Sequence, residues 1–205
     1  ANFVFDSGIM GAMGMFTILF AFLFPFLSFF IELFRKAETP FVNIAVSLLG
    51  VLYVTVPFAL LQVITVHRHN YGGDIMHFTL SYEPYKLLGF FFLMWSNDTY
   101  AYLVGRAIGK TKLWERISPK KTWEGFVGGL LLTQGVAYIL SIYFTELALI
   151  HWMVIGAIVS VFGTLGDLVE SMFKRSLGVK YSGGILPGHG GILDRFDGVL
   201  LASPF

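Results

Sequence analysis

Six acidic residues lie in or beside apolar stretches of this sequence, where ionisable groups are costly and indicate function by default. Two pairs of them, Asp167 with Glu170 and Asp194 with Asp197, are spaced i,i+3, so each pair is expected on one face of a helix. Carboxylate oxygens suit Mg²⁺, which takes one or two carboxylates together with phosphate and water. The alternative is that the acids only form interfacial ion pairs with nearby lysines and arginines. The remaining two acids are Asp98 and Glu124.

A glycine-rich segment leads into the second acidic pair. Residues 186–197 read Leu-Pro-Gly-His-Gly-Gly-Ile-Leu-Asp-Arg-Phe-Asp. Glycine allows a backbone to approach a ligand closely, and packing alone gives a membrane loop little reason to combine glycines, a histidine and two carboxylates. Three roles stay open for the histidine: ligand, phosphate contact or hydrogen-bond partner within the loop. The residues concerned are Gly188, His189, Gly190 and Gly191.

A basic segment at 117–125, Ile-Ser-Pro-Lys-Lys-Thr-Trp-Glu-Gly, has the pattern of a turn into a helix. Ser118 is expected to cap that helix, Pro119 fits its first position and Glu124 falls in its early turns. The N–H groups at such a start, beside Lys120 and Lys121, would form an anion site. The alternative is a basic anchor at the lipid headgroups.

The composition indicates that these residues are positioned by membrane helices. The chain has 205 residues, 56% hydrophobic and 13% charged, whereas a soluble domain has about 25% charged residues. Its 22 Phe, 9 Tyr and 4 Trp exclude disorder, the net charge of +1 gives no indication of nucleic-acid binding, and the absence of cysteine excludes disulfides and thiolate sites. Crossing a bilayer takes about 20 apolar residues. The prediction is an all-α polytopic membrane bundle with spans near 9–34, 41–66, 85–105, 126–144 and 151–173, and a sixth beginning near 192.

The basic residues give an orientation for these spans. Alternate connecting segments carry 2, 6 and 4 lysines and arginines, against 2 and 0 in the segments between them. The positive-inside rule therefore places 106–121 and 174–195 in the cytoplasm, and the six acids at one depth on that side. The sequence begins Ala-Asn-Phe, without an initiator Met, and ends within an apolar run, so it is expected to be a piece of a longer membrane protein. Residues 1–205 are expected to form one transmembrane domain, with N-terminal spans in 1–96 and the catalytic portion in 97–205.

Two segments resemble the signature of the phosphatidate cytidylyltransferase, or CDP-diacylglycerol synthase, family: 171–180, Ser-Met-Phe-Lys-Arg-Ser-Leu-Gly-Val-Lys, and the glycine-rich segment 186–197. Residues 97–106 and 117–125 are similar to two further motifs of that family, in the same order. The resemblance implies a membrane nucleotidyltransferase of phospholipid biosynthesis that converts CTP and phosphatidate into CDP-diacylglycerol and pyrophosphate. It further implies Mg²⁺, K⁺ as a second metal, and a bacterial inner membrane with the site facing the cytoplasm, and it is compatible with a homodimer.

The resemblance also implies residue roles. Metal would be held by Asp167, Asp194 and Asp197. The other catalytic residues would be Lys174, Arg175, Lys180, His189 and Arg195, with the cations neutralising the triphosphate. Substrate would contact Asp98, Ser118, Lys120, Lys121, Glu124, Glu170, Gly188, Gly190 and Gly191.

One departure from the family pattern and two rival functions accompany this interpretation. Tyr181 stands where the family usually has Asp, which predicts reduced activity because a neutral phenol replaces a carboxylate. One rival is a CTP-dependent polyprenol or phytol kinase. The other is an ion or metabolite transporter, which would place acids towards the membrane midplane, whereas the non-cytoplasmic halves of the fourth and fifth predicted spans have none.

Overall fold

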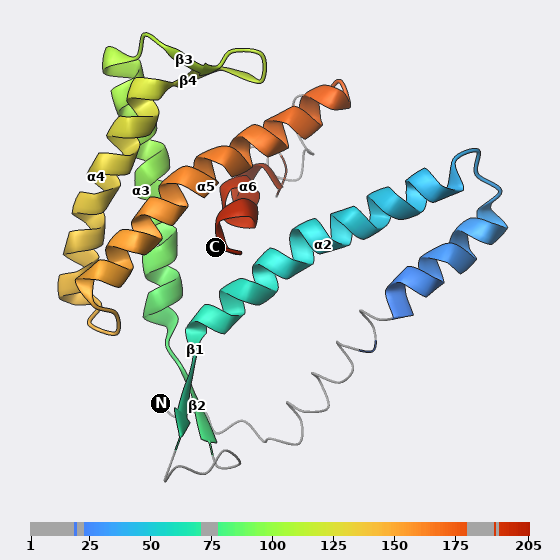
Figure 1. The fold of residues 1–205 in the computed structure, drawn as a ribbon, viewed down its shortest axis with the longest axis horizontal. Helices are drawn as coiled ribbons and strands as arrows, with labels where there is room; N and C mark the ends of the chain where they lie inside the picture. Colours follow the sequence, from blue (N-terminus) through green and yellow to red (C-terminus); the bar gives the residue numbers. More distant parts are fainter. Residues whose placement is uncertain (1–18, 20–22, 71–77, 180–190, 192) are drawn as a thin grey trace. The chain divides into compact units, whose positions relative to one another are not determined.

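The computed structural model describes residues 19, 23–70, 78–179, 191 and 193–205, and helices dominate this part of the chain (Figure 1). The all-α prediction is therefore confirmed. The chain divides into two compact units, one comprising Ala1–Val56 with Val66–Tyr82, the other Pro57–Thr65 with Glu83–Phe205. The second unit contains the acidic and basic motifs.

The first unit holds a helix over residues 23–35 and the beginning of helix α2, Pro40–Thr65. Buried Glu32 joins them, because its carboxylate accepts a hydrogen bond of 2.5 Å from the side-chain amide of Asn43. The unit also contains two strands that the sequence did not predict. Strand β1, Val66–Asn70, pairs antiparallel with β2, Phe78–Tyr82.

The second unit adds four helices and a hairpin: α3, Pro84–Ile108; β3, Lys112–Trp114; β4, Ser118–Thr122; α4, Trp123–Tyr143; α5, Leu149–Ser176; and α6, Leu193–Ala202. Helix α3 packs against α4 and α5, and α5 packs against both α4 and α6 (Figure 1). Buried Trp152 of α5 illustrates how tight this contact is, because a Cβ at Gly89 of α3 would lie 2.3 Å from its ring. The core thus fixes α5, the helix that carries the first acidic pair.

Three described helices, α2, α4 and α5, are long and apolar enough to cross a membrane. Helix α3 has 25 residues but is not among them; its second half includes the polar run from Ser96 to Thr99. Helix α6 has ten residues, or about 15 Å at 1.5 Å per residue, which is half the thickness of a bilayer core. The predicted count of five spans and a partial sixth is therefore not confirmed, and half of the first predicted span, 9–18 with 20–22, lies outside the described residues.

The prediction of a helix start at Ser118 and Pro119 is wrong. Both residues belong to β4, whose register pairs Trp114 with Ser118 and Lys112 with Thr122. Pro119 is tolerated because a two-stranded hairpin leaves N–H positions that need no ladder partner. Helix α4 begins at Trp123, and its cap is Thr122, whose hydroxyl accepts a hydrogen bond of 3.2 Å from the backbone N–H of Gly125.

Candidate active site

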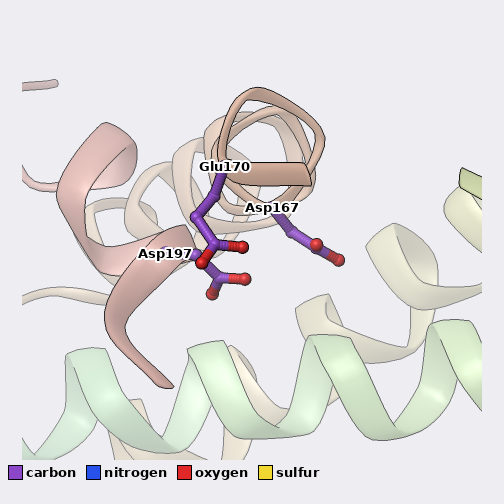
Figure 2. Close-up of side chains that lie close together, drawn as sticks. All are labelled: Asp167, Glu170 and Asp197. Atoms are coloured by element: carbon purple, nitrogen blue, oxygen red, sulfur yellow. The ribbon is translucent and has the colours of Figure 1, made fainter. Parts of the chain in front are cut away.

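Three carboxylates meet where α5 and α6 pack together (Figure 2). Asp167 and Glu170 project from one face of α5 and Asp197 from α6, and one oxygen of each lies within 4.8 Å of the others. The predicted i,i+3 face of α5 is confirmed. We call Asp167, Glu170 and Asp197 the carboxylate cluster.

Neighbouring groups orient two of these carboxylates. The Ser171 hydroxyl, one turn further along α5, donates a hydrogen bond of 3.2 Å to Asp167 Oδ1. The backbone N–H of Gly198 donates one of 2.6 Å to Asp197 Oδ1. Each hydrogen bond engages one carboxylate oxygen and leaves the second for another partner. The two bonds therefore orient the carboxylates of Asp167 and Asp197.

Two lysines contact the cluster from different elements. Lys121, at the end of β4, forms an ion pair with Asp167, with 2.5 Å between Nζ and Oδ2, and lies 3.4 Å from the carbonyl oxygen of Thr164. Lys174 pairs with Glu170, one turn earlier on α5, and also with Asp194 Oδ1 at 2.7 Å. The ion pairs offered as an alternative to a metal site are thus present, and they surround the cluster.

Asp194 connects Lys174 to the end of the glycine-rich segment. Its second oxygen, Oδ2, accepts a hydrogen bond of 2.7 Å from the backbone N–H of Gly191. The sequence grouped Asp194 with Asp167 and Asp197, whereas the structure places Glu170 in that group. Asp194 and Asp197 nevertheless line one cavity, so both acids of the second pair belong to the site.

That cavity has a volume of about 450 Å³ and a lining of mixed chemistry. Its charged residues are Asp98 of α3, Asp167 of α5, and Asp194, Arg195 and Asp197 of α6. Its larger apolar residues are Phe91, Met94, Trp95, Phe196 and Val199. Such a cavity can receive a charged group together with an apolar one.

The carboxylate cluster fits a divalent cation. Oxygen ligands alone suit Mg²⁺. The Glu170 side chain is 1% exposed, and its Oε1 has no hydrogen-bond partner among the described residues. A buried carboxylate oxygen without a partner is costly, and three carboxylates at this spacing repel one another. A cation in contact with the cluster would relieve both effects.

The other predicted site residues lie on β4, α4 and α5, or fall outside the described residues. Glu124 does not join the cluster: its carboxylate accepts hydrogen bonds of 3.0 and 3.2 Å from the Thr111 N–H, which closes the loop before β3. Ser118 and exposed Lys120 lie on β4, and exposed Arg175 lies in the last turn of α5. The residues outside the described part are Lys180, Tyr181, Gly188, His189 and Gly190.

The sequence did not predict the apolar residues that line the cavity or the place of Glu170 within the cluster. A signal for the apolar residues was available, because Phe91, Trp95 and Asp98 are spaced i, i+4 and i+7 and so share a face of α3. No comparable signal separates Glu170 from Asp194, since both are acids at the same spacing from a partner.

Comparisons with known proteins identify the family of the chain. Residues 3–205 match the model of the Cytidylyltransferase family. The phosphatidate cytidylyltransferase of Staphylococcus haemolyticus is 42% identical over 171 residues, which are 82% of this chain and 60% of that protein. The one of Bacillus subtilis is 46% identical over 142 residues, 66% of this chain and 53% of that protein. The chain thus spans at most about 60% of the length of these relatives. Because the family model matches nearly the whole chain, the chain belongs to the cytidylyltransferase family.

Proposed function

We propose that this chain carries the catalytic portion of a phosphatidate cytidylyltransferase, which forms CDP-diacylglycerol and pyrophosphate from CTP and phosphatidate. The observation that carries the proposal is the carboxylate cluster, two of whose members, Asp167 and Asp197, line a cavity with both charged and apolar side chains. The relatives with that name, at 42% and 46% identity, support it. A phosphorylated lipid needs a site of this kind, because its headgroup is charged and its acyl chains are not.

The reaction needs no covalent nucleophile from the protein. An ionised phosphate oxygen of phosphatidate attacks the α-phosphorus of CTP, a new P–O bond forms, and the bond to the β-phosphate breaks with release of pyrophosphate. Catalysis then consists of positioning the two anions and neutralising their charge. The carboxylate cluster, with Asp194 and Asp98, would hold Mg²⁺, which supplies neutralisation for the triphosphate. K⁺ is proposed as a second metal.

The basic residues would act on the phosphates from several sides. Arg195 lines the cavity and would contact the triphosphate, together with Arg175, Lys180 and His189. Lys120 and Lys121 lie on β4 and would contact the phosphate of the lipid. Lys174, held between Glu170 and Asp194, would orient these carboxylates. The acyl chains would stay in the bilayer, close to the apolar residues that line the cavity.

Labelled CTP tests the function directly. Membranes that contain the protein are incubated with phosphatidate or a polyprenol and with CTP labelled at the α- or the γ-phosphate. We expect label from the α-phosphate, and none from the γ-phosphate, in a lipid product that requires phosphatidate. Transfer of the γ-label to polyprenol would instead establish a kinase. If neither lipid is labelled while an active relative, assayed as a positive control, gives labelled product, both enzyme hypotheses would be contradicted. The transporter hypothesis would then remain.

We further propose that the site faces the cytoplasm of a bacterial inner membrane, and that the protein is compatible with a homodimer. The basic residues of the β3–β4 hairpin support this orientation. Helix α4, with 21 residues, spans about 31 Å, so its two ends should lie on opposite sides of the bilayer.

Single cysteines test this orientation, because the natural chain has none. In right-side-out vesicles, an impermeant maleimide should label Thr145→Cys, beyond the end of α4, and should label Ser118→Cys only after permeabilisation. Inverted vesicles should give the reverse pattern. Equal accessibility of both positions from one side would contradict the assignment of α4 as a span.

A further inference from the structure

Helix α6 approaches α5 at a glycine-lined contact directly beside the carboxylate cluster. A Cβ placed on Gly166 of α5 would lie 2.4 Å from the carbonyl oxygen of Asp197 and 3.0 Å from Cα of Gly198. In the opposite direction, a Cβ on Gly198 would lie 3.3 Å from the carbonyl oxygen of Gly163. The two helices therefore meet backbone to backbone, which only glycine permits at this distance.

This contact determines where Asp197 lies. The atom nearest to Gly166 is the backbone oxygen of Asp197 itself, and the Asp197 carboxylate is bonded to the next backbone N–H, that of Gly198. A side chain at Gly166 would push against the α6 backbone rather than against a flexible side chain. The backbone would have to shift, and the Asp197 carboxylate would move with it away from Asp167 and Glu170.

We propose that Gly166 is a positioning residue of the cation site: its lack of a side chain holds Asp197 at the distance from Asp167 and Glu170 at which all three carboxylates contact one cation. This inference rests on the proposed metal site. It assigns to Gly166 an effect on cation affinity, since ligands must be held close to their productive geometry and their supporting contacts commonly contribute tenfold to hundredfold in affinity.

Another glycine of α5 provides a matched control. A Cβ on Gly156 would meet no backbone atom: its nearest neighbours are the side-chain amide of Gln134, at 3.3 Å, and Cβ of Ala137, at 3.6 Å, an ordinary van der Waals distance. Gly156→Ala and Gly166→Ala make the same chemical change in the same helix, with the same gain in helix propensity. They differ in what the new methyl group meets.

The test measures binding of Mn²⁺, a paramagnetic substitute for Mg²⁺, to the purified full-length protein by electron paramagnetic resonance, with helix content followed by circular dichroism. We expect Gly166→Ala to raise the Mn²⁺ dissociation constant about tenfold or more. Gly156→Ala should leave it within about twofold of the parent. Asp197→Asn, which removes a proposed ligand, should weaken binding at least as much as Gly166→Ala.

The outcomes separate this inference from the proposed function. Unchanged Mn²⁺ binding in Asp197→Asn would contradict the metal site. Weakened binding in Asp197→Asn with parental binding in Gly166→Ala would overturn the role of Gly166 and leave the metal site standing. If Gly166→Ala does not fold, Gly198→Ala replaces it, because its methyl group would lie 3.3 Å from the carbonyl oxygen of Gly163, in the same α5–α6 contact, and 3.1 Å from the flexible side chain of Met94. A several-fold weaker affinity supports the inference in that case, and parental affinity overturns it.

Discussion

Asp197→Asn is expected to lower the rate of CDP-diacylglycerol formation by about a thousandfold or more while the protein still inserts into the membrane. The substitution keeps the size of the side chain and removes one of the three charges of the carboxylate cluster. Loss of a metal-proximal carboxylate costs several kcal/mol of transition-state stabilisation, which corresponds to about this factor. The measurement is the initial rate at saturating CTP, phosphatidate and Mg²⁺.

Two controls separate a lost site from a lost fold. Glu146→Gln makes the same kind of change at an exposed position between α4 and α5 and should keep the rate within about twofold. The thermal midpoint of Asp197→Asn should equal or exceed that of the parent, because removing one carboxylate reduces repulsion in the cluster. A parental rate in Asp197→Asn would show that Asp197 is not a required ligand.

Local spacing was enough to predict part of this site. Asp167 and Glu170 share a face because α5 continues without interruption through both residues. The i,i+3 rule therefore applies without knowledge of the rest of the fold. Asp194 and Asp197 reach the same cavity for the same reason, since both lie in α6.

Ion pairs with lysines and arginines were expected as an alternative, but which lysine contacts which acid could not be predicted, because most of these contacts are tertiary. Lys174 reaches Glu170 within its own helix, but its contact with Asp194 joins residues twenty positions apart. Lys121 reaches Asp167 from a hairpin. That hairpin itself was missed, since Ser118 and Pro119 carry a helix-start pattern that is overridden by pairing of β4 with β3. Strands as short as β3, with three residues, and β4, with five, are too short to show a clear alternating pattern.

Lys174→Met is expected to lower the free energy of unfolding by about 3 kcal/mol or more. The Lys174 side chain is 18% exposed and neutralises Glu170, which is 1% exposed, as well as Asp194. Removal of the ammonium group leaves a buried carboxylate without its partner, next to two other acids, and breaking a buried pair in this way costs about 3–5 kcal/mol. The apparent thermal midpoint of the purified protein in detergent should fall, whereas Lys110→Met, at an exposed lysine, should leave it unchanged.

The double variant Lys174→Met/Glu170→Gln distinguishes this role from contact with the triphosphate. If the loss of stability arises from the unpaired carboxylate, removing the charge of Glu170 should restore most of the midpoint, because the amide has no charge to neutralise. If Lys174 acts only on the triphosphate, the Lys174→Met variant should have the same thermal midpoint as the parent and a raised KM for CTP. Because Lys174 contacts both Glu170 and Asp194, a parental midpoint would contradict its structural role between α5 and the start of α6.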